Sequence, residues 1–292
     1  MDYILHLLIL ISIYSILCLT MNIILGYLGI LHLGHPAIYG IGAYAYAILS
    51  INAGFSFFPA LLAGGFFAML AGLILSIPAL RLKSHYVGMA TLAFLIIVQG
   101  LLINMRDLTR GALGIPGIPK PTIFGYYFGS NASFLILSLI LTTIICFILH
   151  RVMHSPFSKI VETIKEDETA SKTIGKNTIK YKIQAFMIAS FFAGIGGGLL
   201  ASYLGFINPT SFDPKELIII VTMVIIGGMA SFWGSILGAA LIILLPEPLR
   251  FIDLPADFVG PLRYAIYGLI LILFMIFKPN GILGKRTNIF SK

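Results

Sequence analysis

The stretch ASFLILSLILTTIICFIL (132–149), HRVMHSPFSKIVETIKEDETASKTIGKNTIKYK (150–182) and IQAFMIASFFAGIGGGLLASYL (183–204) decides the fold of this chain. The two outer runs are continuously apolar and close to about 20 residues, the length at which a helix crosses a hydrocarbon core of about 30 Å. The island between them, residues 150–182, holds 7 of the 19 Lys and Arg and 4 of the 11 acids. The stretch therefore predicts two membrane helices joined by one large polar segment on which a soluble protein can bind.

The composition of the whole chain agrees with a membrane protein. Of its 292 residues, 59% are hydrophobic and only 10% are charged, and the mean hydropathy is +1.01. In lipid the backbone must satisfy its own hydrogen bonds as a helix or a closed barrel, and the apolar runs are continuous rather than alternating. We therefore expect an all-α, polytopic helical bundle forming a single transmembrane domain over residues 1–292. The net charge is +8, and the basic residues lie between the apolar spans. This placement favours a role in membrane orientation over nucleic-acid binding.

Nine membrane spans are predicted, with eight or ten as the alternatives. The first has Asp2 and no basic residue before Arg81, so it is expected to be a retained helix rather than a cleaved signal peptide. Two segments, 36–51 and 235–246, are short and rich in Gly and Ala, and either could be a half-helix. The expected spans are 3–25, 36–51, 55–77, 87–104, 132–149, 183–204, 217–232, 235–246 and 262–277.

The distribution of basic residues predicts the orientation in a prokaryotic cytoplasmic membrane. Residues 150–182 and the tail from Lys278 are the most basic regions, so both should be cytoplasmic. Counting spans backwards then places the N-terminus and residues 105–131 and 246–261 outside. The basic residues of 105–131 depart mildly from this rule, and they either serve a partner or ligand or lie there by chance.

Several function classes lack the residues that they need. All 11 acids fit in loops or at span ends, whereas ion-driven carriers usually keep an ionisable group near the middle of the membrane. The sequence has no GxxxxGK[ST] loop for ATP and no HExxH or GxSxG motif. His32 and His35 lack a third ligand and are expected to be interface or turn residues, and Cys18 and Cys146 to be small core residues. We expect no cofactor and no metal.

The polar island is predicted to contain two short helices. Ser155 and Pro156 suit a helix start, and the apolar residues Phe157, Ile160, Val161 and Ile164 then fall at positions i, i+3, i+4 and i+7. A second helix is expected over 169–174, ended by Gly175. Such a segment would form a rigid knob at the cytoplasmic face, and a solvated loop is the alternative.

The segment EDETASKTIGKN (166–177) resembles the coupling loop of ABC importer permeases. It is most similar to the LivM-type permease subunits of branched-chain amino acid importers, in which a similar run follows Ser-Pro. Relative to the general importer motif, the chain has one residue more before Gly175. The resemblance is therefore to the LivM/LivH branch.

Further stretches resemble the same family. They follow one another in the order found in the family and together cover nearly the whole chain. Ala230 and Arg110 depart from the pattern, because the family often has Gly at both positions. The matching stretches are NIILG (22–26), LGHPAIYGIGAY (33–44), YVGMATLAF (86–94), LTRGALGIPGIP (108–119), GGMASFWG (227–234) and KPNGILG (278–284).

The resemblance implies a set of partners and a role for the island. The partners would be a LivH-type second permease, two ABC ATPases of the LivG/LivF type, a soluble extracytoplasmic binding protein and the lipid bilayer, with no nucleic acid. Residues 150–182 would be the ATPase-coupling loop. Ala170 and Gly175 would be close-packing positions, Asn177 would support the exit turn, and the acids Glu166, Asp167 and Glu168 would make polar contacts.

Solute contacts are harder to assign from the sequence. The candidates for the translocation path are Gly34, Gly40, Gly42, Thr91, Thr109, Gly111 and Gly114. Each can expose backbone or hydroxyl groups to a solute or serve only as a helix contact. Leucine, isoleucine and valine are the solutes that the family implies, and other amino acids, urea or short amides are alternatives. An ion-coupled carrier and a membrane enzyme or assembly factor are the more remote ones.

Overall fold

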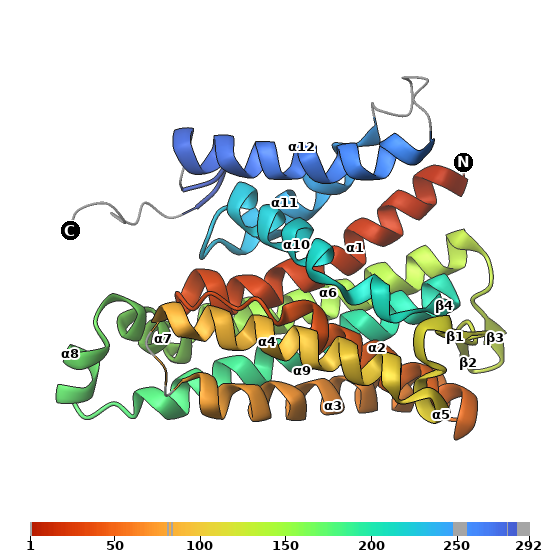
Figure 1. Cartoon of the computed structure of the whole chain (residues 1–292), viewed down its shortest axis with the longest axis horizontal. Helices are drawn as coiled ribbons and strands as arrows, with labels where there is room; N and C mark the ends of the chain where they lie inside the picture. The colour runs from red at the N-terminus through yellow and green to blue at the C-terminus, as the bar shows by residue number, and fades with distance from the viewer. Residues whose placement is uncertain (1, 81, 83, 248–255, 279, 285–292) are drawn as a thin grey trace.

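The structure is a computed structural model, and it describes the chain except residues 1, 81, 83, 248–255, 279 and 285–292 (Figure 1). It is an all-α bundle, as the sequence predicts, and the described residues also form four two-residue strands that the sequence did not predict. The elements in order are α1 (Asp2–Asn22), the π-helical turn η1 (Ile23–Tyr27), α2 (His35–Asn52), α3 (Phe57–Ala79), α4 (Ser84–Asn104), α5 (Arg106–Thr109), η2 (Gly111–Leu113), β1 (Ile115–Pro116), β2 (Thr122–Ile123), β3 (Tyr126–Tyr127), α6 (Asn131–Met153), α7 (Pro156–Glu166), α8 (Glu168–Thr173), α9 (Thr178–Leu204), β4 (Phe206–Ile207), η3 (Pro209–Phe212), α10 (Pro214–Gly227), α11 (Phe232–Leu244) and α12 (Ala256–Phe277).

Each of the nine predicted spans contains a helix, but the helices differ in length. Among the described residues, six are long and apolar enough to cross a membrane: α1 with η1, α3, α4, α6, α9 and α12. The helix α2 is continuous over 18 residues but carries His, Pro and several Tyr. The helices α10 and α11 have only 14 and 13 residues, about 21 and 20 Å at 1.5 Å per residue, so neither alone matches a core of about 30 Å.

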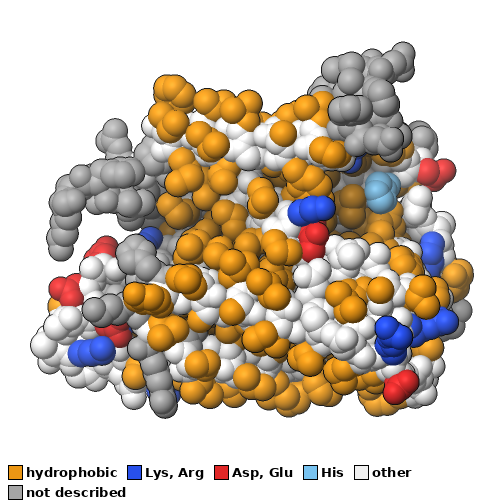
Figure 2. All heavy atoms as spheres, in the orientation of Figure 1, with side chains coloured by type: hydrophobic (Ala, Val, Ile, Leu, Met, Phe, Trp, Pro, Cys, Tyr) orange, Lys and Arg blue, Asp and Glu red, His pale blue; other side chains and the backbone are white. Residues whose placement is uncertain are grey.

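The long helices lie side by side along the length of the molecule (Figure 1). One end of the bundle carries α7 and α8, and we call it the α7 end. The other end carries the four short strands, and we call it the strand end. Figure 2 shows hydrophobic side chains over most of one face, with charged side chains mainly near the two ends. Such a surface is suited to lipid or to another apolar protein.

Small residues let α2, α3 and α9 approach closely. A Cβ atom added at Gly42 of α2 would lie 2.3 Å from the Cα atom of Gly194 in α9. A Cβ atom at Gly194 would lie 2.4 Å from the Cβ atom of Ala68 in α3. Side chains larger than glycine at these positions would force the backbones apart, so the glycines set the distance between the three helices.

The helices α10 and α11 form an antiparallel hairpin. A Cβ atom at Gly227 would lie 2.0 Å from the carbonyl oxygen of Gly234, and one at Gly238 would lie 2.0 Å from that of Met223. After α12, the backbone amides of Ile282 and Leu283 donate to the carbonyls of Ile226 and Gly227 at 2.8 and 3.0 Å. The turn of the hairpin and the segment after α12 therefore meet.

Asn22, near the end of α1, holds the turn of this hairpin through four hydrogen bonds. Its Nδ2 donates to the Ser231 carbonyl at 3.0 Å, to the Gly228 carbonyl at 3.4 Å and to Ser235 Oγ at 2.6 Å. Its Oδ1 accepts from the backbone amide of Ala230 at 3.0 Å. One fully buried amide therefore satisfies backbone groups that the turn leaves free.

The two residues that depart from the family's sequence pattern share one backbone property. Ala230 has φ of 57° and Arg110 has φ of 60°, both in the left-handed region. Glycine adopts this region without the Cβ penalty that other residues incur. The backbone conformation therefore explains why glycine suits both positions.

The predicted span 36–51 is uninterrupted, because α2 is continuous over it. The irregular segment lies instead before α10, in residues 205–213. Residues 205–213 hold β4, which pairs with β1 at the strand end, and η3, whose Phe212 ring lies 5.1 Å from that of Tyr39 in α2. Glu216, in the first turn of α10, accepts a hydrogen bond from Tyr14 at 2.5 Å. Tyr14 lies at the middle of the first span, residues 2–27, so this acid reaches deeper than the sequence predicted.

We predict that replacing Gly42 with Leu destabilises the bundle. The new side chain would clash with the backbone of α9, which cannot relieve the clash by changing a rotamer as a side chain could. Overpacking of this kind costs about 1–3 kcal/mol or more. The measurement is the thermal midpoint of the purified chain, taken as the temperature at which half of the monodisperse protein is lost. The matched control is Gly100→Leu in α4, because a Cβ atom there meets nothing within 4 Å. Equal midpoints for the two variants would contradict the close contact.

Candidate coupling segment and solute path

The coupling segment, residues 150–182, forms the two predicted helices. Helix α7 starts directly after Ser155, with Pro156 at its first position. Val161 and Ile164 of the predicted apolar stripe are 1% and 3% exposed. Phe157 is partly buried against the Tyr181 ring of α9, with 5.9 Å between centroids. The stripe is therefore covered by the chain itself, and the opposite face of α7 is the one available to another protein.

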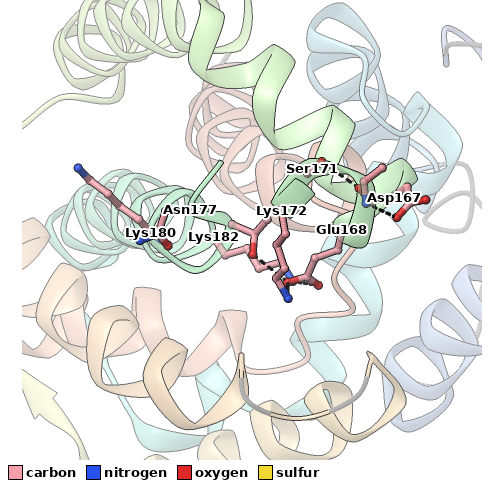
Figure 3. Close-up of polar contacts among 9 residues, drawn as sticks. Asp167, Glu168, Ser171, Lys172, Asn177, Lys180 and Lys182 are labelled. Atoms are coloured by element: carbon pink, nitrogen blue, oxygen red, sulfur yellow. Dashed lines mark hydrogen bonds and ion pairs between the residues drawn. The ribbon is translucent and has the colours of Figure 1, made fainter. Parts of the chain in front are cut away.

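The three candidate acids occupy different positions at the junction of α7 and α8, and Figure 3 shows two of them, Asp167 and Glu168. Glu166 is the last residue of α7 and is exposed. Asp167 caps α8, since its Oδ1 accepts from the backbone amide of Ala170 at 2.9 Å. Asn177 does the same for α9 by accepting from the amide of Lys180 at 3.1 Å. Two of the candidate residues therefore define helix starts within the segment.

Glu168 ties α8 to the start of α9 (Figure 3). Its carboxylate lies 3.1 Å from Lys172 Nζ and 2.6 Å from Lys182 Nζ, and it accepts from Thr178 Oγ1 at 3.0 Å. Burial alone would raise the pKa of Glu168, but hydrogen bonds from Lys182, Lys172 and Thr178 lower that pKa to about 2. The carboxylate is therefore charged at neutral pH and holds the second helix in place.

Gly175 ends α8 in the manner predicted. Its φ is 80°, its amide donates to Lys172 at 3.0 Å, and the next amide, of Lys176, donates to Ser171 at 3.1 Å. This pair of bonds is a Schellman motif, which requires a left-handed residue at that position. A Cβ atom at Gly175 would meet nothing within 4 Å, so both Gly175 and the exposed Ala170 face open space.

Two large apolar side chains are exposed at this end of the molecule. Ile174 is 70% exposed and Ile179 is 51% exposed, and both flank Gly175. On a polar segment, side chains of this kind are suited to burial against a partner.

Lys165, to which the sequence analysis assigned no role, links the candidate coupling segment to the first span. Its Nζ donates to the carbonyl oxygen of Gly26, at the end of the π-helical turn, at 2.8 Å. Partial burial lowers the pKa of Lys165, and the charges of Glu162 and Glu166 oppose that shift. The sequence signal for this contact is a lysine beside a buried apolar stripe. The aliphatic part of such a side chain can pack with the stripe while its amine donates to a carbonyl oxygen.

The candidate path residues do not meet at one place. Gly34, the N-cap of α2, and Thr91 lie together, since Thr91 Oγ1 accepts from the amide of Leu33 at 2.9 Å. Gly40 lies against Phe212, and Gly42 against α9. At the strand end, the buried Thr109 Oγ1 donates to the Leu102 carbonyl at 2.6 Å and accepts from the Gly111 amide at 3.2 Å.

The remaining candidate, Gly114, belongs to the same turn as Gly111. A Cβ atom at Gly114 would lie 2.2 Å from the carbonyl oxygen of Ile207. Helix contact or turn formation therefore accounts for the position of each candidate path residue.

His32 and His35 form a buried pair beside α1. Their ring centroids are 6.0 Å apart, and His35 Nε2 lies 3.1 Å from Thr20 Oγ1. Within the described part of the chain, no group of three or more His, Cys, Asp or Glu is placed to hold a metal ion. The pair is therefore described as a packing element at the start of α2.

Comparisons with known proteins agree with this architecture. The family model described as the branched-chain amino acid transport system permease component matches residues 3–275. Over 294 residues the chain is 35% identical to the high-affinity branched-chain amino acid transport system permease protein LivM of Escherichia coli K12, covering 93% of this chain and 68% of that protein. It is 23% identical to the probable LivM of Methanocaldococcus jannaschii, over 78% of this chain and 68% of that protein. No solved structure matches.

A more distant relative is the high-affinity branched-chain amino acid transport system permease protein LivH of Escherichia coli K12. It is 23% identical over 94% of this chain and 92% of its own length. A bundle of apolar helices with a helical polar segment at one end is the architecture of a polytopic membrane protein. Within that class, the chain belongs to the permease components of branched-chain amino acid transport systems.

We predict that Lys165→Met loosens α7 from the end of the first span. The variant keeps the length of the side chain but loses a charge-assisted hydrogen bond, which contributes about 1.5–3 kcal/mol. Hydrogen–deuterium exchange of the α7 amides should therefore accelerate by roughly tenfold or more. Lys159→Met is the control, because Lys159 is exposed on the same helix. Equal exchange in both variants would show that the Gly26 contact does not hold α7.

Proposed function

We propose that this chain is a permease subunit of an ABC importer that carries leucine, isoleucine and valine across the cytoplasmic membrane of a prokaryote. The observation that carries the proposal is the family match over residues 3–275 together with the ordered coupling segment that lies within it. The named relatives are permeases of branched-chain amino acid systems. ATP hydrolysis would take place on partner subunits.

In this proposal the whole chain is one transmembrane domain that crosses the membrane nine times. The helices α10 and α11 supply two short crossings, and residues 205–213, with the short strand β4 and the single turn η3, fill the remaining depth before α10. Backbone of this kind is tolerated in a membrane only where protein buries it, and Phe212 and Ile207 are 2% and 1% exposed. The α7 end, with its basic residues, would be cytoplasmic, and the strand end would be outside.

The coupling proposal rests on which faces of α7 and α8 are free. The apolar stripe of α7 is buried, so the face open to an ATPase consists of polar residues and the exposed Ile174. In this arrangement Ile174 and Ala170 would enter a cleft on the ATPase, with Gly175 allowing the chain to turn sharply beside them. Glu166 would offer a polar contact, while Asp167, Glu168 and Asn177 keep the docking surface in shape.

The remaining partners follow from the same proposal. A LivH-type permease would cover an apolar face of the bundle, two LivG/LivF-type ATPases would bind at the α7 end, and a soluble binding protein would deliver the solute at the strand end. Support for the second permease comes from the apolar side chains left exposed on α4 and α12, which include Ile96, Ile97, Ile272 and Ile276. Lipid would cover the rest of the apolar surface.

We predict that Ala170→Trp and Ile174→Asp abolish leucine uptake while the protein stays in the membrane. The first fills the space where the ATPase would pack, and the second places a charge in an apolar contact, which costs several kcal/mol without a partner. The measurement is uptake of labelled leucine by cells that produce the complete importer. Ala170→Ser and Ile174→Leu are the controls and should keep uptake. Gly175→Trp should also abolish uptake, through lost docking space and through its positive φ.

Normal uptake in both Ala170→Trp and Ile174→Asp would remove the coupling assignment. Membrane levels are compared by immunoblot, so that loss of protein is not mistaken for loss of coupling.

We predict the orientation through two single-cysteine variants made after Cys18 and Cys146 are replaced by Ala. Phe124→Cys, at a fully exposed site of the strand end, should react with a membrane-impermeant maleimide in intact cells. Ile174→Cys should react only in inside-out vesicles, because a charged reagent does not cross the bilayer. The opposite labelling pattern would invert the proposed topology.

A further inference from the structure

A groove of about 650 Å³ lies between α1, α6 and α11. Its residues on α6 run from Leu139 to His150, about 16 Å at 1.5 Å per residue, which is about half of a hydrocarbon core of about 30 Å. His150 is in the last turn of α6, so one end of the groove lies at the α7 end of the bundle. The groove therefore extends from that end toward the middle of the membrane, over the depth of one lipid leaflet.

The walls of the groove are apolar and open. The large side chains of Leu8, Leu139 and Phe147 line it and are exposed. In a membrane, apolar side chains that stay exposed are covered by lipid or by another apolar protein.

Three of the four hydroxyls that line the groove donate within the protein. Ser12 and Ser15 donate to carbonyls of α1, each at 2.7 Å, and Thr142 of α6 donates to the carbonyl of Ser12 at 3.2 Å. The fourth hydroxyl belongs to Thr143, which is exposed on α6. The hydroxyls therefore serve the two helices themselves, and the surface that remains suits a hydrocarbon chain better than a polar solute.

Basic side chains gather at the α7 end of the groove. His150 lines it, and the ring centroids of His150 and His154 are 4.0 Å apart. Arg151 is exposed, and its guanidinium carbon lies 5.4 Å from the centre of the Phe147 ring, which is itself part of the groove. Arg151 forms no ion pair with any residue that the structure describes. Its N–H donors are therefore open to an anion, and a guanidinium binds a phosphate through two parallel hydrogen bonds.

Trp233 marks the same end of the groove. It lines the groove from the first turn of α11 and is exposed. The ring of its neighbour Phe232 lies 5.0 Å from that of His150. Trp side chains gather where hydrocarbon meets the lipid headgroups, because the ring is apolar and its N–H is polar. This end of the groove therefore lies at the depth of the headgroups.

We propose that this groove binds an anionic phospholipid, with its phosphate at Arg151 and His150 and one acyl chain along the apolar walls. An acyl chain gains little by leaving other acyl chains, so the headgroup decides which lipid binds. A zwitterionic headgroup brings its own cation to Arg151, whereas an anionic one brings only negative charge. The inference goes beyond the proposed function and does not depend on the solute that the chain carries.

The position of the second permease in the proposed importer leaves room for this lipid. That subunit is placed against α4 and α12, whereas the groove is formed by α1, α6 and α11. A protein on the groove is therefore the competing occupant that the experiments must distinguish from lipid.

The first test uses the fluorescence of Trp233, which is the one Trp of the chain. The full chain is placed in phosphatidylcholine nanodiscs that contain a small, equal fraction of phosphatidylglycerol or phosphatidylcholine with brominated acyl chains, since bromine quenches Trp on contact. The quenching should give phosphatidylglycerol an apparent affinity about fivefold higher, as expected for one basic side chain near anionic lipid. Equal quenching by the two lipids overturns the proposal.

The headgroup contact is tested with Arg151→Gln in the same nanodiscs. This variant should lose the preference for phosphatidylglycerol, while quenching by phosphatidylcholine stays unchanged and shows that Trp233 keeps its surroundings. Lys159→Gln is the matched control, because it removes an exposed cation of α7 that does not line the groove. A preference that survives Arg151→Gln, or that is lost equally in Lys159→Gln, overturns the proposal.

The acyl-chain contact is tested with Cys146→Phe, which narrows the groove from α6. Quenching by phosphatidylglycerol should fall to the level of phosphatidylcholine, because the chain can no longer lie along the walls. Ile140→Phe, on the exposed side of α6 and outside the groove, should keep the preference. The same preference in both variants would show that the lipid does not lie in the groove.

A second measurement identifies the occupant in the cell membrane. The photoreactive residue p-benzoylphenylalanine takes the place of Phe147, whose ring is exposed within the groove, and cells that produce the complete importer are irradiated. Cross-links to phospholipid support the proposal. Cross-links to another protein, the second permease included, or the absence of any phospholipid adduct overturn it.

Discussion

The hydrogen bonds of one buried amide, Asn22, hold together the part of the bundle that departs from simple crossing helices. A turn within a membrane protein leaves amides and carbonyls without helical partners, and lipid cannot supply them. Asn22 serves the turn between α10 and α11 from the neighbouring first span, and the segment after α12 adds two backbone bonds. The first span, the hairpin and the end of α12 therefore form one connected unit.

A hydrogen bond joins this unit to the polar segment 150–182. Lys165 of α7 bonds the carbonyl of Gly26, four residues after Asn22. In the proposed mechanism, a movement of α7 on an ATPase would reach the end of the first span through this bond and the hairpin turn through Asn22. The hairpin carries Glu216 at its other end, so the proposed docking site and this deep acid are linked by one set of contacts.

Much of the architecture could be predicted from local sequence. Long apolar runs have only one backbone solution in lipid, and each predicted span contains a helix. The start of α7 after Ser155 and the end of α8 at Gly175 were also predicted, because caps and left-handed glycines act over a few residues. Residues 205–213 lie between two predicted spans, and the sequence did not predict that this irregular segment packs against the core or that Glu216 lies as deep as Tyr14. Neither has a local signal, since contacts with Tyr39 and Tyr14 decide them.

The sequence by itself determined that the chain is a helical membrane protein, which segments are helical and where the large polar segment lies. These properties depend on hydropathy, helix periodicity and capping, all of which are local. Only the tertiary structure decided that the apolar stripe of α7 is covered by the chain itself, that Lys165 and Asn22 connect distant elements, and that Glu216 meets Tyr14 of the first span. Those outcomes depend on side chains far apart in the chain meeting in space, and no short stretch of sequence encodes that distance.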